Sequence, residues 1–145
     1  MADVADLDAA LRRIVADAVK ALIMEVTANL VEACPVDTGH ARANFVPRIG
    51  APFAGVASGP GEHDAGVASL LSFKLGDGDA FVTNNVPYIG PLIGGHSDQA
   101  PAGWDLEAID KAVQTIQAQY DELVLEVSGS TTVAIGGGEL DTGDS

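Results

Sequence analysis

Apolar residues recur at steps of three and four along the first part of the chain, from Val4 to about Ala33. This spacing places them on one face of a helix. The segment contains neither Gly nor Pro, and Pro35 disfavours helical geometry in the residue before it. At about 1.5 Å per residue the predicted helix is about 45 Å long, which exceeds the width of a compact domain of this size. We therefore expect part of it to pack on another chain.

A second helical pattern begins near Asp105, which can serve as an N-cap, and continues at the same spacing to Val127, with Gly129 ending it. Between the two patterns, residues 34–104 hold all seven prolines and most of the glycines. The apolar runs of this region are short: Phe45–Val46, Ala80–Val82 and Val86–Ile89. They predict a small, mainly antiparallel sheet with long loops.

Two segments are less regular. The apolar run at residues 65–75 is interpreted as a short helix, although its length also allows a strand. Residues Thr131–Ile135 suit a strand, but the glycines around them and the acidic end of the chain are typical of a mobile extension. The predicted fold class is α+β. It has a long N-terminal helix, a small antiparallel sheet, a C-terminal helix packed on the first, and a single domain at 1–128 followed by a flexible acidic extension at 129–145.

Charge and composition narrow the possible partners. The 145 residues include 21 Asp and Glu but only 7 Lys and Arg, a formal net charge of −14. Residues 1–33 and 34–104 each carry −3, whereas residues 105–145 carry −8. Such a surface repels nucleic-acid phosphates and anionic membranes. A single cysteine, Cys34, excludes a disulfide within the chain, and no secretory signal or apolar membrane span is evident, so we expect a protein made in the cytosol.

The candidate catalytic and ligand-binding motifs are weak. His96-Ser97-Asp98 has the residue types of a hydrolase triad, but sequence neighbours cannot adopt the required order of contacts. Glu62-His63-Asp64 lacks metal-site spacing and is interpreted as a solvated loop. The glycine pairs and triplets at 94–95 and 136–138 lack the residues of a phosphate loop, and Cys34 is interpreted as a core residue. We expect no enzymatic activity, cofactor or metal.

Three loop segments have a more definite character. Pro35–Gly39 predicts a helix stop and turn, with Arg42 following it as a possible partner for an acid or a backbone carbonyl. The segments 84–89 and 92–104 are dense in turn residues and contain Tyr88 and Trp104. These two side chains suit either an interface or a shared core beneath the loop.

The same segments resemble the neck or tail-completion family of long-tailed bacteriophages. The resemblance rests on three motifs in the family's order, spread over about residues 5–127: Pro35-Val36-Asp37-Thr38-Gly39 with Ala41-Arg42-Ala43-Asn44-Phe45, then Asn84-Asn85-Val86-Pro87-Tyr88, then Gly95-His96-Ser97-Asp98-Gln99-Ala100-Pro101-Ala102-Gly103. It implies a structural protein of the virion, assembled in the bacterial cytoplasm as a ring of six or twelve copies. The ring joins the portal or adaptor side of the head to the tail-terminator or tail-tube proteins, and genomic DNA passes through its lumen without specific binding.

This resemblance suggests which residues meet neighbours. The residues expected at subunit or ring interfaces are Pro35, Asp37, Thr38, Gly39, Arg42, Asn85, Pro87, Tyr88, Ser97, Gln99, Pro101 and Trp104. The acids expected to face the DNA channel are Asp77, Asp79, Asp121, Glu122 and Glu126. The alternative is an acidic DNA mimic or regulatory inhibitor of phage origin, although charged residues are only 19% of the chain and hydrophobic residues 47%. A small hydrolase is the third candidate.

Overall fold

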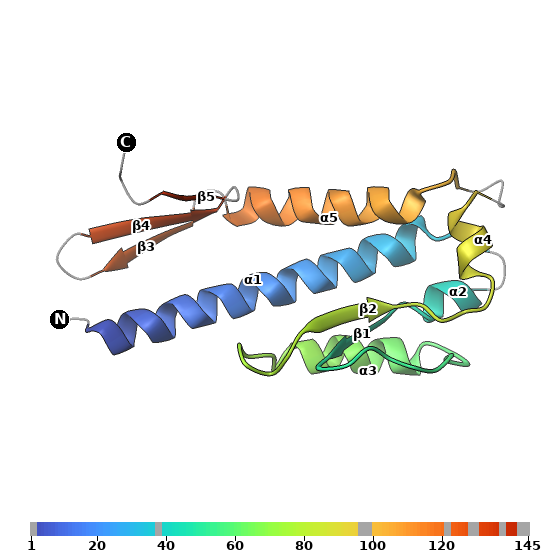
Figure 1. Ribbon diagram of the computed structural model, residues 1–145, viewed down its shortest axis with the longest axis horizontal. Helices are drawn as coiled ribbons and strands as arrows, with labels where there is room; N and C mark the ends of the chain where they lie inside the picture. Colours follow the sequence, from blue (N-terminus) through green and yellow to red (C-terminus); the bar gives the residue numbers. More distant parts are fainter. Residues whose placement is uncertain are drawn as a thin grey trace.

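The computed structural model describes residues 3–36, 39–95, 100–120, 123–127, 131–136 and 139–141. The helix α5 lies along α1 on one side, and a two-stranded sheet with α3 behind it lies on the other side (Figure 1). The helices are α1 (Val4–Ala33), α2 (His40–Ala43), α3 (Gly61–Leu70), α4 (Ile89–Ile93) and α5 (Trp104–Tyr120). The strands are β1 (Val46–Ile49), β2 (Ala80–Thr83), β3 (Leu123–Val127), β4 (Thr131–Gly136) and β5 (Glu139–Asp141).

Helix α1 has the bounds that its apolar spacing predicts. A capping box starts it: the Asp6 N–H donates to the Asp3 side chain at 2.9 Å, and the Asp3 N–H donates back to the Asp6 carboxylate at 3.4 Å. The buried residues of the helix are Ala16, Thr27 and Leu30. None of them lies in its first three turns, so the contacts that hold α1 in the fold are concentrated toward its C-terminal end.

Helix α5 packs on α1, as predicted, and buries the small side chains Ala108 and Ala112 against it. Asn29 on α1 donates from Nδ2 to the carbonyl oxygen of Ala108 at 3.2 Å. The helix ends at Tyr120, however, and the predicted continuation to Val127 is wrong. The sequence Leu-Val-Leu-Glu-Val at 123–127 suits a strand as well as a helix, and pairing with β4 decides between them.

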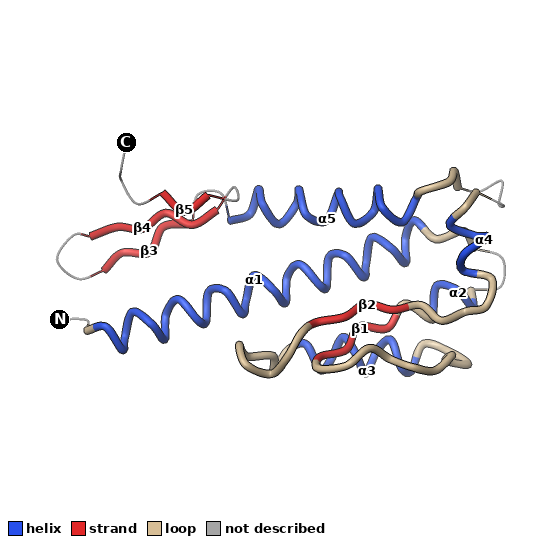
Figure 2. Tube along the Cα trace, viewed as in Figure 1, coloured by secondary structure: helices blue, strands red, loops and turns tan. Residues whose placement is uncertain are grey.

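Strands β3, β4 and β5 form an antiparallel sheet in that order (Figure 2). Leu123 pairs with Ile135 and Val127 with Thr131, and on the other side of β4 Ile135 pairs with Leu140. Residues Thr131–Ile135, whose composition also suited a strand, lie within β4. This sheet spans the boundary predicted at residue 128, because β3 lies before that position and β4 and β5 lie after it.

Strands β1 and β2 form the predicted small antiparallel sheet, with Val46 opposite Thr83 and Ile49 opposite Ala80. Helix α3 covers β1, and Gly66 on this helix approaches so closely that a Cβ there would overlap the carbonyl oxygen of Pro47. The run at 65–75 is helical only as far as Leu70, where a turn begins.

The apolar run Val86–Ile89 is not a strand, because Val86 and Pro87 lead into a turn and Ile89 begins α4. Proline has no N–H to donate to a sheet. The turn closes with a hydrogen bond from the Ile89 N–H to the Val86 carbonyl oxygen at 3.0 Å. This run therefore adds no third strand to β1 and β2.

The principal hydrophobic cluster gathers around the C-terminal end of α1. Its buried members are Leu30, Cys34, Ala41, Phe45, Trp104 and Ala108, and residues of α4 pack against them. The loops that connect α1, α2, α4 and α5 therefore converge at one end of the molecule.

Candidate interaction site

The turn after α1 is held by Arg42. Its Nε donates to the carbonyl oxygen of Cys34 at 2.9 Å, and Nη2 donates to that of Glu32 at 3.1 Å. No basic residue lies in the last turn of α1 itself, so Arg42 supplies the cation that the free carbonyls at a helix C-terminus favour. Gly39 precedes α2 with φ +80°, a conformation that favours glycine. The sequence left two partners open for Arg42, an acid or a backbone carbonyl, and the structure shows backbone carbonyls.

The second motif is tied to the first by its asparagines. Asn84 Nδ2 donates to the carbonyl oxygen of Ala41 at 2.9 Å, and its Oδ1 accepts from the Val86 N–H at 3.1 Å. Asn85 donates to the carbonyl oxygens of Phe53 and Gly55 at 2.7 and 3.0 Å, so it anchors the loop after β1. Pro87 and Tyr88 remain exposed at the surface of this junction.

Tyr88 and Trp104 have different environments. Tyr88 is 43% exposed, and its ring centroid lies 6.4 Å from that of His40. Trp104 is 3% exposed and packs edge-on against Phe45 at 6.2 Å between ring centroids. Its Nε1 donates to the carbonyl oxygen of Leu92 at 3.0 Å. Trp104 is therefore a core residue, which is one of the two roles, core or interface, that the sequence left open for it. Tyr88 is the aromatic residue of this pair that is available to a partner.

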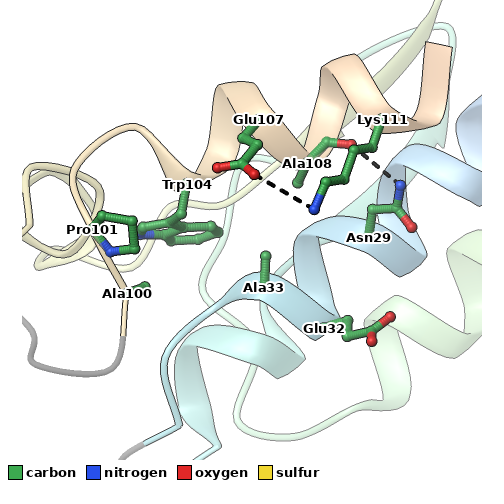
Figure 3. Close-up of a pocket in the computed structure, with 9 residues that line it drawn as sticks. All are labelled: Asn29, Glu32, Ala33, Ala100, Pro101, Trp104, Glu107, Ala108 and Lys111. Carbon is green, nitrogen blue, oxygen red and sulfur yellow. Dashed lines mark hydrogen bonds and ion pairs between the residues drawn. The ribbon is translucent and has the colours of Figure 1, made fainter. Parts of the chain in front are cut away.

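An open groove of about 480 Å³ lies between α1 and α5 beside this core (Figure 3). It is lined by Asn29, Glu32 and Ala33 of α1, by Trp104, Glu107, Ala108 and Lys111 of α5, and by Ala100 and Pro101 of the preceding loop. An ion pair between Lys111 and Glu107, at 3.5 Å, lies along its rim. The predicted interface residue Pro101 and one edge of Trp104 thus border a surface groove.

A smaller apolar pocket of about 370 Å³ lies on the other side of the turn after α1. Val31, Gly39, Arg42, Ala43, Pro60 and His63 line it. His63 belongs to the first turn of α3, where its Nδ1 lies 2.8 Å from the Phe45 carbonyl oxygen, and its neighbour Glu62 forms an ion pair with Arg48. The interpretation of residues 62–64 as a solvated loop is therefore wrong, because these residues connect α3 to the β1 region.

Cys34 is 1% exposed within the principal cluster, and its Sγ lies 3.6 Å from the carbonyl oxygen of Pro35. Burial raises the pKa of its thiol, and the nearby Arg42 charge lowers it by a smaller amount. A buried thiol that keeps its proton is a poor nucleophile. Cys34 is a core residue, as predicted.

Several predicted residues fall elsewhere or outside the described chain. Asp77 and Asp79 are exposed on the loop leading into β2, where the Asp77 carboxylate accepts from the Lys74 N–H at 2.8 Å. Glu126 belongs to β3, and its backbone pairs with Thr132. Asp37, Thr38, Ser97, Gln99, Asp121 and Glu122 lie outside the described residues, as do His96 and Asp98 of the triad-like motif.

Sequence reasoning assigned no role to Asn44, although it lies within the first motif. This side chain is 1% exposed and makes hydrogen bonds to the backbone of both His40 and Ala57. Its loop partner, Ala57, lies thirteen residues further along the chain. No local sequence signal identifies Ala57 as that partner. Asn44 is the residue that fixes the loop after β1 to the end of α2.

The described residues contain no group of three or more His, Cys, Asp or Glu side chains that could hold a metal ion. Among the described helices, none combines the length and the apolar character needed to cross a membrane. No protein-family model matches the chain, and neither a curated protein nor a solved structure shows significant similarity to it.

Proposed function

We propose that this chain is a neck or tail-completion subunit of a long-tailed bacteriophage, which forms a ring joining the head connector to the tail. The observation that carries the proposal is the convergence of the three motifs of the resemblance. Arg42 of the first motif donates a hydrogen bond to the backbone at the end of α1, and Asn84 of the second motif donates one to the carbonyl oxygen of Ala41. The Gly103 N–H, at the end of the third motif, donates to the Ile93 carbonyl oxygen at 3.0 Å. Segments far apart in sequence thereby build one end of the molecule.

This end offers the surfaces that a ring subunit needs. Tyr88 and Val36 are exposed apolar side chains there, and the two grooves beside the turn after α1 are open to a neighbour. Aromatic side chains with partial exposure are enriched in protein interfaces. In this proposal the motif residues shape a rigid platform, and the adjacent subunit or the adjacent ring rests on it.

The long α1 helix supports the same proposal. Val4 and Val15 are exposed apolar residues on its first half, where Ala16 is the one residue buried within the chain. A helix that leaves its apolar positions so weakly covered gains stability when a second copy packs on it. The first half of α1 is accordingly a contact surface between neighbouring copies.

Charge supports a channel through which DNA passes. The net charge of −14 opposes adsorption of phosphates, and Asp77 and Asp79 are exposed acids that could line a lumen. The virion location, the portal or adaptor-side partner and the tail-side partner belong to this proposal. They follow from the resemblance, and the charge distribution agrees with them.

The deciding experiment measures the mass of the purified chain over a wide range of concentrations, by native mass spectrometry and by imaging of the particles. A closed ring of six or twelve copies is the expected result. A monomer or dimer at every concentration would instead favour the alternative, an acidic regulatory protein that occupies a basic site on a host protein.

A further inference from the structure

A groove of about 510 Å³ lies between the first half of α1 and the turn that follows α3. Its lining residues are Ala9, Arg12, Arg13, Ala16, Asp17 and Lys20 of α1 and Phe73, Lys74 and Leu75 of the turn. We call it the basic groove. Its floor is apolar, because Ala16 and Phe73 are buried there, and its rim carries long charged side chains.

The charge of this groove is opposite to that of the chain as a whole. Four of the seven basic residues of the protein line it, with one acid among them. Arg12 pairs with Asp8 at 2.9 Å and Lys20 with Asp17 at 3.6 Å. Over the part of the chain that the structure describes, neither Arg13 nor Lys74 forms an ion pair, although both are exposed. Two cations on the rim thus have no counterion from the described residues.

A segment with complementary chemistry exists in the same sequence. Residues 105–145 carry a charge of −8, and β5 has the sequence Glu139-Leu140-Asp141. In this segment two acids flank one apolar residue. A short acidic segment that also contains an apolar residue matches a groove with an apolar floor and a basic rim.

The β5 strand of the same chain does not occupy this groove. Figure 1 shows the β3–β4–β5 sheet beyond α5 on one side of α1, whereas the turn that carries Phe73–Leu75 precedes β2 on the opposite side. An acidic strand that reaches the basic groove therefore comes from another molecule. A second copy is the partner that the charge distribution within this one sequence favours.

We infer that the basic groove of each copy receives the acidic β5 segment, Glu139–Asp141, of a second copy, with Arg13 and Lys74 as its ion-pair partners. The inference rests on the proposed ring and specifies one of its subunit contacts. A head-to-tail contact of this kind uses two different surfaces on each molecule, and repeated contacts close into a ring when the rotation between neighbours closes.

The experiment uses the full-length chain and measures the concentration at which half of the molecules are assembled, with the double variant Arg13→Glu/Lys74→Glu. We expect that concentration to rise at least about tenfold, because reversed charges repel the acidic segment. The variant Glu139→Lys/Asp141→Lys should give a similar loss. Combining all four substitutions should restore assembly to within about threefold of the wild type, because the ion pairs are re-formed with opposite sense.

The control is Gln117→Glu/Gln119→Glu, which also adds negative charge, at two exposed positions of α5 that line none of the grooves described above. It should leave the half-assembly concentration within about twofold of the wild type. Circular dichroism and thermal midpoints show whether each variant is folded. A variant that is folded but does not assemble has lost the contact, whereas one that is unfolded has lost the structure.

The outcomes separate this inference from the proposed function. If Arg13→Glu/Lys74→Glu assembles into rings at the same concentration as the wild type, the inference is overturned and the ring proposal stands. Loss of assembly that the four-substitution variant does not restore also overturns it, because β5 is then not the occupant. A wild-type chain that never assembles overturns the proposed function together with the contact inferred here.

Discussion

Asn44 and Ala57 exchange two hydrogen bonds through the interior of the protein. Asn44 Oδ1 accepts from the Ala57 N–H at 2.7 Å, and Asn44 Nδ2 donates to the Ala57 carbonyl oxygen at 3.0 Å. The same Nδ2 donates to the carbonyl oxygen of His40 at 2.9 Å. A side-chain amide thus supplies both partners that a neighbouring strand would otherwise give to Ala57.

Substitution Asn44→Ala should lower the free energy of unfolding by roughly 3 kcal/mol, because it leaves buried backbone groups of Ala57 and His40 without partners. Urea unfolding monitored by circular dichroism measures the change. Asn85→Ala is the matched control: Asn85 also bonds two backbone carbonyls but is exposed, so water replaces the lost partner and the expected cost is below about 1 kcal/mol. Equal costs for the two variants would show that the burial of Asn44 does not matter.

Two glycines of α3 provide a second comparison. Gly66→Ala should destabilise the fold by at least about 3 kcal/mol, since its methyl group overlaps the backbone oxygen of Pro47 and forces α3 away from β1. Gly61→Ala meets no atom within 4 Å and should change the stability by less than about 1 kcal/mol, toward greater stability. Thermal melts of both variants test this, and a Gly66→Ala protein as stable as Gly61→Ala would contradict the close packing of α3 on β1.

Burial of Cys34 links stability to alkaline pH. In the folded chain, burial raises the pKa of its thiol, and the charge of Arg42 lowers it by a smaller amount. In the unfolded chain the thiol has a pKa of about 8.5. The folded state therefore keeps a proton that the unfolded state releases, and this group's contribution to stability falls as the pH rises above about 8.5.

The measurement is the free energy of unfolding at pH values from 7 to 10, for the wild type and for Cys34→Ala. The wild type should lose more stability with rising pH than the variant does, although the variant starts lower because it loses packing. Parallel pH profiles would show that the folded and unfolded thiols titrate alike. Thiol-specific labelling of the native wild type should also be slow until denaturant is added.

Tyr88 belongs to the platform that we propose as a subunit contact near the C-terminal end of α1. Tyr88→Ala should weaken ring assembly about tenfold or more while shifting the thermal midpoint by only a few degrees, because the side chain is 43% exposed in the single chain. Val56→Ala removes an apolar side chain of similar exposure, 49%, from the loop after β1 and should leave assembly unchanged. Assembly that is insensitive to Tyr88→Ala would remove this residue from the interface.

The elements predicted best are those with local signals. Helix α1 begins where Asp3 and Asp6 form a capping box and ends just before the Cys34-Pro35 pair, and both signals lie within a few residues of the helix ends. The end of α5 was predicted incorrectly, since residues 123–127 satisfy the spacing of a helix and of a strand. Their pairing partner, β4, decides the outcome through contacts that no local window contains.

The candidate site shows the same contrast between residues with local sequence signals and residues that long-range contacts bring together. Arg42 follows a helix stop at short distance and was expected to pair with an acid or to reach a backbone carbonyl; its two hydrogen bonds go to backbone carbonyls. Trp104 and Tyr88 could not be distinguished from sequence, because the packing of α5 on α1 buries one and leaves the other exposed. The basic groove was not foreseen, since Arg13 and Lys74 lie sixty-one positions apart and meet only in the folded chain.

The uneven burial along α1 has a consequence for its motions. Thr27 and Leu30 belong to the buried part of the helix, whereas its first three turns hold no buried side chain. Amide protons near Leu30 exchange with solvent only when the whole core opens, whereas those of the first turns exchange through local fraying at a far lower free-energy cost. The helix is thus anchored firmly at one end and can adjust its direction at the other. In the ring that we propose, this freedom would let one subunit fit neighbours that approach at slightly different angles.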